Sequence, residues 1–317
     1  MNQPLAPRLY WDPLFLEHRT GDHPETPERL RHLYSWLPGR PVFERYIRGE
    51  FQSAERRQLE RVHDPAYIDH VRTFAQEGGG RIESDTVVSQ RSYEVAAAAA
   101  GAAIAAVDDV LSGKASRGVC LIRPPGHHAL VQEPMGFCLF NSVAVAARHA
   151  LVHHSLERVL IVDWDVHHGN GTQDIFYESP EAWFLSVHRS PFYPGTGAAH
   201  ETGRGRAVGT KFNLPLRLGT TRLAFREQFQ TLLEQAAAKC RPNLVLISAG
   251  FDAHAADPIG SLGLETEDFE PLTRLVSQVA DQYCAGRLVS LLEGGYHIHK
   301  LADCVECHLQ ALLPAAT

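Results

Sequence analysis

The sequence predicts an α/β fold in which a single domain of 317 residues is built around a parallel sheet. Three observations support this fold class. Short apolar runs recur along the chain, helical stretches lie between them, and no repeat or Gly/Ser-rich or Pro-rich linker divides the sequence. Alternating strands and helices are typical of layered α/β folds, and the continuous pattern favours one domain over residues 1–317.

The predicted strands are nearly continuous in apolar residues, as is typical of strands buried on both faces of a parallel sheet. Strand-like runs begin near Arg8, and the clearest occupy residues 120–122, 158–166, 183–187, 243–250 and 287–295. The predicted helices span residues 93–111, 141–152, 225–239 and 266–285. In such a sheet, ligands bind outside the carboxyl ends of the strands.

Composition excludes several classes of function. Hydrophobic residues make up 44% of the chain, and the formal net charge is −7, so neither disorder nor direct nucleic-acid binding is expected. The longest apolar run, 95–107, is mostly alanine and too short to span a membrane. The N-terminus does not resemble a signal peptide, so we expect a cytoplasmic protein whose six cysteines are reduced, including the Cys304 and Cys307 pair.

Polar clusters follow nearly every predicted strand. In chain order they are RPPGHHA, DWDVHHGN, SVH, AGFDAH and EGGY. In the second cluster Asp163, Asp165 and His167 alternate with apolar residues, so an extended strand end would project all three to one side. Asp252 leaves another strand end and could complete an Asp, His, Asp set with an open position, as catalytic zinc sites require.

Two further clusters carry groups suited to acid–base chemistry. His127 and His128 are adjacent in RPPGHHA, and histidine is the side chain best able to carry protons near neutral pH. Tyr296 follows two glycines, and its hydroxyl could donate to a developing oxyanion. The sequence lacks the H-E-x-x-H, G-x-S-x-G and P-loop patterns, and the glycine-rich stretch 195–209 is interpreted as a surface loop.

The ordered motifs resemble one known family. RPPGHHA, GFCLFNSVAVAA, DWDVHHGNGTQ, SVH followed by FYPGTG, SAGFDAHAADPIG and EGGY are together similar to the zinc-dependent histone deacetylase and acetylpolyamine amidohydrolase family. The resemblance extends from HPETPER at 23–29 to about Leu312. Asn170, in place of an aspartate, makes the chain resemble the class II branch and its bacterial relatives.

The resemblance implies a fold and two kinds of metal site. The fold is an arginase-like three-layer α/β/α domain with an eight-stranded parallel sheet. The resemblance also implies Zn²⁺ on Asp165, His167 and Asp252, and a structural K⁺ that involves Asp163, Ser186 and Val187 together with main-chain oxygens along 163–167.

The matching positions also imply roles around the metal. Asp163 stands behind His127 and Asn170 behind His128, where each orients its imidazole through the other ring nitrogen. Arg29 matches an arginine near the foot of the pocket, a position that a buried structural arginine could equally fill.

The substrate tunnel is implied in the same way. Gly136 matches a glycine that accepts a bond from the acyl-amide N–H, and Phe137 and Tyr193 match two aromatic residues of the tunnel, although phenylalanine is usual at the second. Ile259 stands where the family's polyamine deacetylase has a glutamate that attracts ammonium groups, so it offers apolar surface instead of charge.

These features predict a zinc-dependent amidohydrolase that removes acetyl or other acyl groups from the side-chain amine of lysine in proteins or peptides. An acetylpolyamine deacetylase would share every catalytic residue. An arginase-like enzyme is disfavoured because Gly169 interrupts the D-x-H-x-D run that a two-manganese site uses. A catalytically inactive module that only binds acyl-lysine is the alternative from another class. Oligomeric state is left open.

Overall fold

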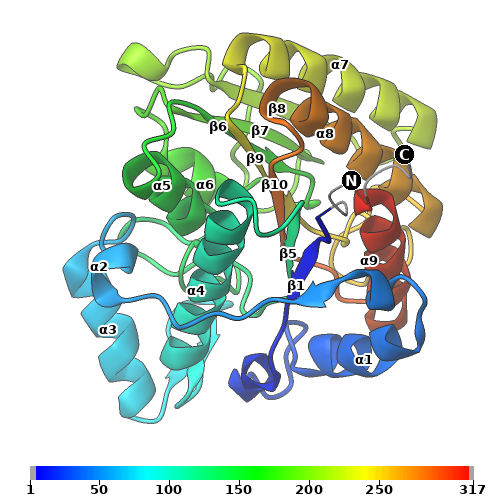
Figure 1. The fold of residues 1–317 in the computed structure, drawn as a ribbon. Helices are drawn as coiled ribbons and strands as arrows, with labels where there is room; N and C mark the ends of the chain where they lie inside the picture. Colours follow the sequence, from blue (N-terminus) through cyan, green and yellow to red (C-terminus); the bar gives the residue numbers. More distant parts are fainter. Residues whose placement is uncertain (1–4, 314–317) are drawn as a thin grey trace.

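The computed structural model describes residues 5–313 and is built on one eight-stranded sheet in which every neighbouring pair of strands is parallel (Figure 1). The strand order across the sheet is β2-β1-β5-β10-β9-β6-β7-β8. The strands are β1 (Arg8–Tyr10), β2 (Ile47–Arg48), β5 (Gly118–Cys120), β6 (Val159–Asp163), β7 (Ala182–Arg189), β8 (Lys211–Leu216), β9 (Leu244–Ala249) and β10 (Leu288–Leu292). Strands β3 (Gly80–Arg81) and β4 (Val87–Val88) form a separate antiparallel pair.

Helices cover both faces of the sheet and give the three layers (Figure 1). One face carries α4 (Ser92–Leu111) and α5 (Ser142–His153), with α2 (Arg56–Leu59), α3 (Pro65–Gln76) and α6 (Asn170–Ile175) packed against them. The other face carries α7 (Arg222–Cys240), α8 (Phe269–Cys284), α9 (Ile298–Leu312) and α1 (Glu28–Trp36). Short 3-10 helices span Pro13–Glu17, Leu37–Gly39, Phe43–Arg45, Gly205–Ala207 and Thr266–Asp268.

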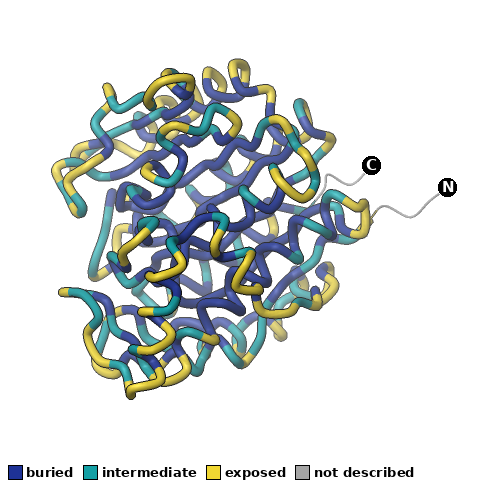
Figure 2. The backbone as a smooth tube through the Cα atoms, turned by 90° about the vertical axis from the view of Figure 1, so that its left-hand side faces the viewer, coloured by how far each residue is buried: buried dark blue, intermediate teal, exposed yellow. Residues whose placement is uncertain are grey.

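The core lies along the central strands, which Figure 2 shows as a continuous buried region. Every residue of β6, β9 and β10 is buried. Their nearly continuous apolar sequences predicted this, because a parallel sheet is covered on both faces. The alanine-rich α4 is buried on almost all sides, because its small side chains let it pack closely on both the sheet and α5. The fold class, the three layers and the eight parallel strands are therefore confirmed.

One predicted strand ends earlier in the structure, and one strand of the sheet was not predicted. The predicted run 158–166 ends earlier, at Asp163, because the chain leaves the sheet there to form the polar cluster. Strand β8 was not predicted, since its sequence KFNLPL contains a lysine and a proline. Pro215 is tolerated because β8 is an edge strand. The predicted extent of the domain, 1–317, includes residues outside 5–313 and stays a prediction.

Lys211 shows why β8 is hard to predict. Its side chain is buried, and its ammonium donates to Ala182 O at 2.8 Å and to Thr210 Oγ1 at 2.6 Å. A buried charge normally requires such partners, which only the folded chain brings together. Burial lowers the pKa of Lys211 to about 7.

Three further expectations concern membrane spans, cysteines and the glycine-rich stretch. Within residues 5–313, none of the helices is both long and apolar enough to cross a membrane. All six cysteines are free, and Cys304 and Cys307 lie on α9. The stretch 195–209 is mostly loop, with one 3-10 turn at Gly205–Ala207.

A buried ionic network joins the N-terminal segment to the end of β10. Glu25 accepts from Arg29 at 3.0 Å and from two nitrogens of Arg123 at 2.5 and 2.7 Å. Arg29 also donates to Glu293 O at 2.6 Å and to Gly295 O at 2.7 Å. Burial alone would raise the pKa of Glu25, but Arg123 and His18 hold it well below its ordinary value. Arg29 is thereby a buried structural arginine that fixes the backbone of the EGGY cluster.

Glu25→Gln should destabilise the protein by roughly 3 to 5 kcal/mol, because it leaves two buried guanidinium groups without their counter-charge. Urea unfolding would measure this, with Glu28→Gln as the matched control. Glu28 pairs with Arg31 at the surface, where loss should cost less than about 1 kcal/mol. Because the folded pKa of Glu25 is depressed, its contribution is present at neutral pH and is lost as the pH falls through that pKa. Equal costs for the two variants would contradict the role of this network.

Candidate active site

The polar clusters converge because their strands are neighbours. β5, β10, β9, β6 and β7 lie side by side in the sheet and run in the same direction, so four clusters leave the same edge, and SVH lies in the last part of β7. Asp163, at the end of β6, is level with Ser186 on β7 and Ser248 on β9. The order of these clusters along the chain therefore differs from their order in space.

Asp165, His167 and Asp252 form a buried group that could hold a metal ion. One ligand atom from each lies within 4.8 Å of the other two. His167 Nδ1 is 3.0 Å from Asp165 Oδ1 and 3.1 Å from Asp252 Oδ2. Backbone N–H groups hold the other carboxylate oxygens: Gly294 N donates to Asp165 Oδ2 at 2.9 Å, and Val166 N donates to Asp252 Oδ1 at 2.8 Å.

Two observations test whether this group fits a cation. Asp252 Oδ2 is buried and accepts no well-aligned hydrogen bond among the described residues, although His167 Nδ1 lies 3.1 Å away. A Cβ placed on Gly294 would collide with the carboxylates of both Asp252 and Asp165, so only glycine lets the backbone pass this close. A buried carboxylate oxygen without a well-aligned hydrogen bond, in a cradle closed by glycine, fits a metal ion, which would supply positive charge there.

The electrostatics agree with this fit. Burial and the neighbouring Asp165 raise the pKa of Asp252, so without a cation nearby one of the two carboxylates resists ionisation. Burial alone would lower the pKa of His167, but the two carboxylates raise it to about 10. The protein surrounds the group with negative charge, which favours a divalent ion.

His127 is held as the charged member of the histidine pair. Its Nδ1 lies 2.9 Å from Asp163 Oδ2, and its backbone N–H donates to Glu293 Oε2 at 3.2 Å. Burial alone would lower the pKa of His127, but Asp163 and Asp165 raise it to about 10. An imidazolium fixed by a buried carboxylate is suited to orientation and electrostatic support.

His128, in contrast, is held as a neutral imidazole. Its Nδ1 lies 2.6 Å from the side-chain oxygen of Asn170, whose amide nitrogen faces the sulfur of Met135 at 3.2 Å. An amide oxygen only accepts, so Nδ1 carries the proton and Nε2 keeps its lone pair. Burial and the nearby charges of His127 and His167 lower the pKa of His128 well below its usual value. His128 is therefore neutral and can accept a proton.

A cavity of about 200 Å³ opens onto these residues. It is walled mainly by aromatic and apolar groups and is lined by Asp85, His128, Gly136, Phe137, His167, Phe192, Tyr193, Ile259 and Tyr296. The ring of Phe192 stacks on His167 at 5.1 Å, and that of Tyr193 meets His128 edge-on at 5.3 Å. Every tunnel residue expected from the sequence thus lines one cavity.

The backbone at Gly136 and Phe137 is specialised. Gly136 has φ +55°, and a Cβ there would collide with the ring of His128. Phe137 has φ +70°, a region that side chains disfavour, and Thr86 Oγ1 accepts its N–H at 3.1 Å. Glycine at 136 therefore lets the backbone lie close to the His128 ring, and the next residue, Phe137, lines the cavity.

Tyr296 is anchored from two sides. Its backbone N–H donates to Asp257 Oδ2 at 2.7 Å, and the guanidinium of Arg29 lies 4.9 Å from its ring centre. Its ring meets that of Phe137 edge-on at 5.7 Å. Burial raises the pKa of Tyr296 well above its usual value, so its hydroxyl keeps its proton and remains a donor.

The residues expected around a monovalent cation are also close together. Asp163 and Ser186 are register partners on adjacent strands, and Val187 follows Ser186. All three are buried, and Asp163 Oδ1 accepts from Asp165 N at 3.0 Å. The same carboxylate therefore faces both His127 and this part of the sheet.

Sequence reasoning missed four residues of the site. Glu293 bridges Gly126 N and Ser248 Oγ at 2.6 and 3.0 Å, although it stands in the EGGY motif itself. Asp257 ties the loop after β9 to Tyr296, and its place before Pro-Ile-Gly was the available signal. Phe192 adjoins Tyr193 in FYPGTG. Asp85 lies far from every motif, so no local pattern indicated it.

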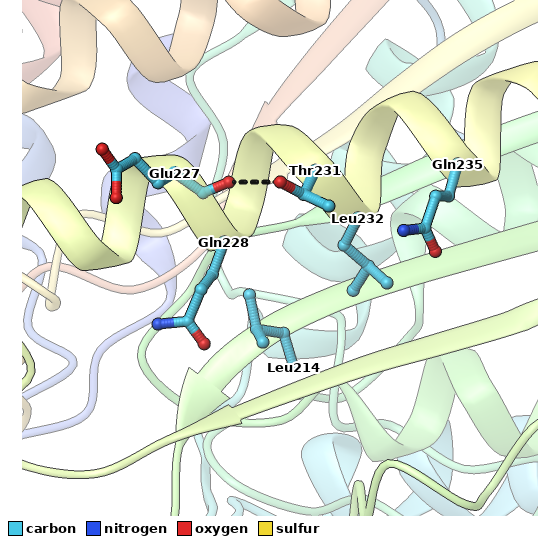
Figure 3. Close-up of a pocket in the computed structure, with 6 residues that line it drawn as sticks. All are labelled: Leu214, Glu227, Gln228, Thr231, Leu232 and Gln235. Carbon is cyan, nitrogen blue, oxygen red and sulfur yellow. Dashed lines mark hydrogen bonds between the residues drawn. The ribbon is translucent and has the colours of Figure 1, made fainter.

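A second cavity, between α7 and β8, differs in chemistry (Figure 3). It measures about 310 Å³ and is lined by Leu214, Glu227, Gln228, Thr231, Leu232 and Gln235. The Thr231 hydroxyl donates to Glu227 O at 2.8 Å within the helix. Its lining holds neither a histidine beside that hydroxyl nor a metal-ligand set, so the strand-end cavity is the candidate active site.

Comparisons with known proteins point to one family. A family model described as the histone deacetylase domain matches residues 23–312. The rice protein "Histone deacetylase 10, chloroplastic" is 39% identical over 96% of this chain and 73% of its own length. The "Histone deacetylase-like amidohydrolase" of Pseudomonas aeruginosa is 39% identical over 86% of this chain and 72% of its own length.

Two further relatives extend this likeness. The human "Polyamine deacetylase HDAC10" is 38% identical over 97% of this chain and 46% of its own length. The crystal structure of the HDA15 HD domain superposes with a TM-score of 0.90 at 35% identity, covering 96% of this chain and 90% of that chain. The resemblance inferred from the motifs is thereby confirmed.

Asp252→Asn should remove one equivalent of bound divalent metal, because it leaves only Asp165 and His167 as charged or imidazole ligands. Metal analysis after equilibrium dialysis would measure the loss. Asp69→Asn, an exposed residue on α3, is the matched control and should bind as much metal as the wild type. Undiminished metal content in Asp252→Asn would rule out this group as a metal centre.

Proposed function

We propose that this chain, which belongs to the histone deacetylase family, is a zinc-dependent amidohydrolase that removes acetyl or other acyl groups from the side-chain amine of lysine in peptides or proteins. The observation that carries the proposal is the position of the Asp165, His167 and Asp252 group beside His128 and Tyr296 in a narrow apolar cavity. Metal ligands, a base and an oxyanion donor thus meet in one place.

Zinc suits the donor set. One imidazole and two carboxylates are three protein ligands, which leaves a position open for water or substrate, as in catalytic zinc sites. When bound, Zn²⁺ would polarise the amide carbonyl and acidify a water molecule. A K⁺ ion near Asp163, Ser186 and Val187 is part of the proposal, which is supported by the burial of all three residues and by the pairing of Asp163 with Ser186 on adjacent strands.

His128 is the proposed general base. Its Nε2 lone pair is free because Asn170 engages Nδ1, and its lowered pKa keeps it neutral at pH 7. It would take the proton of the attacking water and return it to the leaving amine. His127, held as an imidazolium by Asp163, would orient the reacting groups and offset the developing negative charge.

Tyr296 is the proposed oxyanion donor. Its hydroxyl keeps its proton, and Asp257 and Arg29 fix its backbone and ring before substrate arrives. A donor that is already in place costs no reorganisation as the carbonyl oxygen gains charge. Gly136, which lines the same cavity, would accept a hydrogen bond from the N–H of the scissile amide.

The walls of the cavity suit a lysine stem. Phe137, Phe192 and Tyr193 offer ring faces or edges, and Ile259 adds apolar surface. An aliphatic chain of four methylenes can be buried along such walls while its acylated nitrogen reaches the metal.

Asp85 favours a second candidate, an acetylpolyamine deacetylase. It lines the same cavity, and it is the acidic residue there outside the proposed metal group. Burial and the neighbouring Glu83 raise its pKa, so a cation nearby would stabilise its charged form. A carboxylate at this position could accept from an ammonium of a polyamine or from a backbone N–H of a peptide.

Tyr296→Phe should lower turnover of an acetyl-lysine peptide by about 10²- to 10³-fold, because it removes one oxyanion donor and keeps the ring. Steady-state kinetics on the zinc-loaded protein would measure this, with metal content determined in parallel. Tyr283→Phe on α8 lies outside the cavity and is the control. A wild-type rate in Tyr296→Phe would refute the oxyanion role.

Ile259→Glu should shift the preference from acetyl-lysine peptides toward N-acetylated polyamines by roughly fivefold in kcat/KM, which corresponds to an exposed ion pair of about 1 kcal/mol. Ile259→Gln has nearly the same size without the charge and should not produce this shift. The wild-type protein should prefer the peptides. A wild-type preference for acetylated polyamines would favour the second candidate and leave the metal chemistry intact.

A further inference from the structure

Three histidines and an aspartate meet at the end of α5, far along the helix from the active site. They are His149 and His153 on α5, His154 directly after it, and Asp108 in the last turn of α4. One ligand atom from each of the four lies within 4.8 Å of the others. We propose that this group, the α4–α5 cluster, is a second metal site that binds a divalent transition metal such as Zn²⁺ and cross-links the two helices.

Two members of the cluster share one carboxylate oxygen of Asp108 through hydrogen bonds. Asp108 Oδ1 lies 2.7 Å from His149 Nε2 and 2.6 Å from His154 Nε2. The ring centres of His149 and His153 are 4.8 Å apart, and those of His153 and His154 are 5.0 Å apart. Two imidazoles therefore already point at one carboxylate oxygen, and the third imidazole stands beside them.

Metal binding through Asp108, His149 and His154 needs a small expansion of the two contacts that Asp108 makes. Ligand atoms around a tetrahedral Zn²⁺ lie roughly 3.3 Å apart, since each bond is about 2.0 Å. The oxygen–nitrogen distances must therefore grow by well under 1 Å. Asp108 and His154 have 43% and 24% of their side chains exposed, so they have room to move, whereas the buried His149 supplies a fixed point.

The spacing and the helix ends both favour a cation. His149 and His153 are four residues apart on α5, which puts them on one face of the helix. The cluster lies at the carboxyl ends of both α4 and α5, where the helix dipoles present partial negative charge. Three neutral imidazoles with one carboxylate suit Zn²⁺, Cu²⁺ or Ni²⁺ better than Mg²⁺ or Ca²⁺.

The α4–α5 cluster is separate from the active site. Helix α5 begins beside the catalytic edge, where the side chain of its first cap, Asn141, donates to Ala129 O at 3.3 Å. It then runs to the opposite edge of the sheet and ends before β6 starts at Val159. Figure 1 shows α4 and α5 on the same face of the sheet, and they pack against each other. A metal here would pin the helix layer without contacting substrate.

Arg61 opposes metal binding and provides a sharp test. Its Nη1 lies 3.3 Å from His149 Nδ1, and a guanidinium can only donate. In this state the proton of neutral His149 sits on Nε2, the nitrogen that faces Asp108. Coordination through Nε2 requires the proton to move to Nδ1, where it would confront Arg61. Replacing Arg61 with a residue that accepts a hydrogen bond from His149 Nδ1–H should therefore strengthen metal binding.

The first experiment counts bound zinc. Chelator-stripped protein is titrated with Zn²⁺ against a competing indicator; the wild type should bind two equivalents. His153→Ala/His154→Ala and Asp108→Asn should each lose one. His70→Ala, an exposed helical histidine outside the cluster, should bind two. Asp252→Asn should lose the other equivalent and keep this one, so failure of the proposed active site and failure of this proposal are distinguishable.

The second experiment measures stability and the effect of residue 61. In protein that already holds one Zn²⁺, further Zn²⁺ should raise the melting temperature of the wild type but not of His153→Ala/His154→Ala. Arg61→Gln, whose amide oxygen can accept from Nδ1–H, should bind the second Zn²⁺ about tenfold more tightly than Arg61→Lys, which keeps a donor.

Other results would overturn the proposal. If the wild type and the double variant bind the same number of zinc ions, or show the same thermal shift, the α4–α5 cluster is only a hydrogen-bonded group at the surface. If Arg61→Gln and Arg61→Lys bind the second Zn²⁺ equally, His149 is not a ligand. Deacylation by His153→Ala/His154→Ala should equal that of the wild type, since the cluster does not reach the cavity.

Discussion

The candidate active site depends on one constraint, the burial of several carboxylates at one edge of the sheet. Asp163, Asp165, Asp252 and Glu293 are each at most 2% exposed, and they converge because their strands are neighbours. Burying ionised groups without partners is prohibitively costly. Backbone N–H groups and two imidazoles offset part of this cost, and a cation bound at Asp252 would offset more. The burial of these carboxylates accounts for the fit of the Asp165, His167 and Asp252 group to a metal ion, for the charged state of His127 and for the glycine at position 294.

The opposite charge states of the two adjacent histidines arise from what stands behind them. Asp163 faces His127 and holds it as an imidazolium, whereas the neutral amide of Asn170 faces His128 and leaves it free to accept a proton. A second buried network, in which Glu25 joins Arg29 and Arg123, holds the chain that carries Tyr296. Groups outside the cavity therefore determine the chemistry inside it.

The alternation of strands and helices gives the two edges of the sheet different side chains. Strands present side chains and free backbone groups at their carboxyl ends, where the active site lies, whereas the helices that return the chain end at the opposite edge. Helix carboxyl ends carry partial negative charge, and the α4–α5 cluster adds Asp108 and three imidazoles there. Each edge thus carries a group that could hold a cation, one made of buried aspartates with His167 and the other of Asp108 with three histidines.

Much of this protein could be predicted from its sequence by itself. Buried parallel strands need apolar residues on both faces, so β6, β9 and β10 were recognisable, and Asp165, His167 and Asp252 stood out as polar residues directly after them. The tertiary structure alone decided what depends on contacts between distant segments. These contacts include Asp85 in the cavity, the bond from His127 N to Glu293, the partners of Lys211 in β8 and the meeting of Asp108 with three histidines. Periodicity reports which face of an element is buried, but which charges meet depends on how the layers pack.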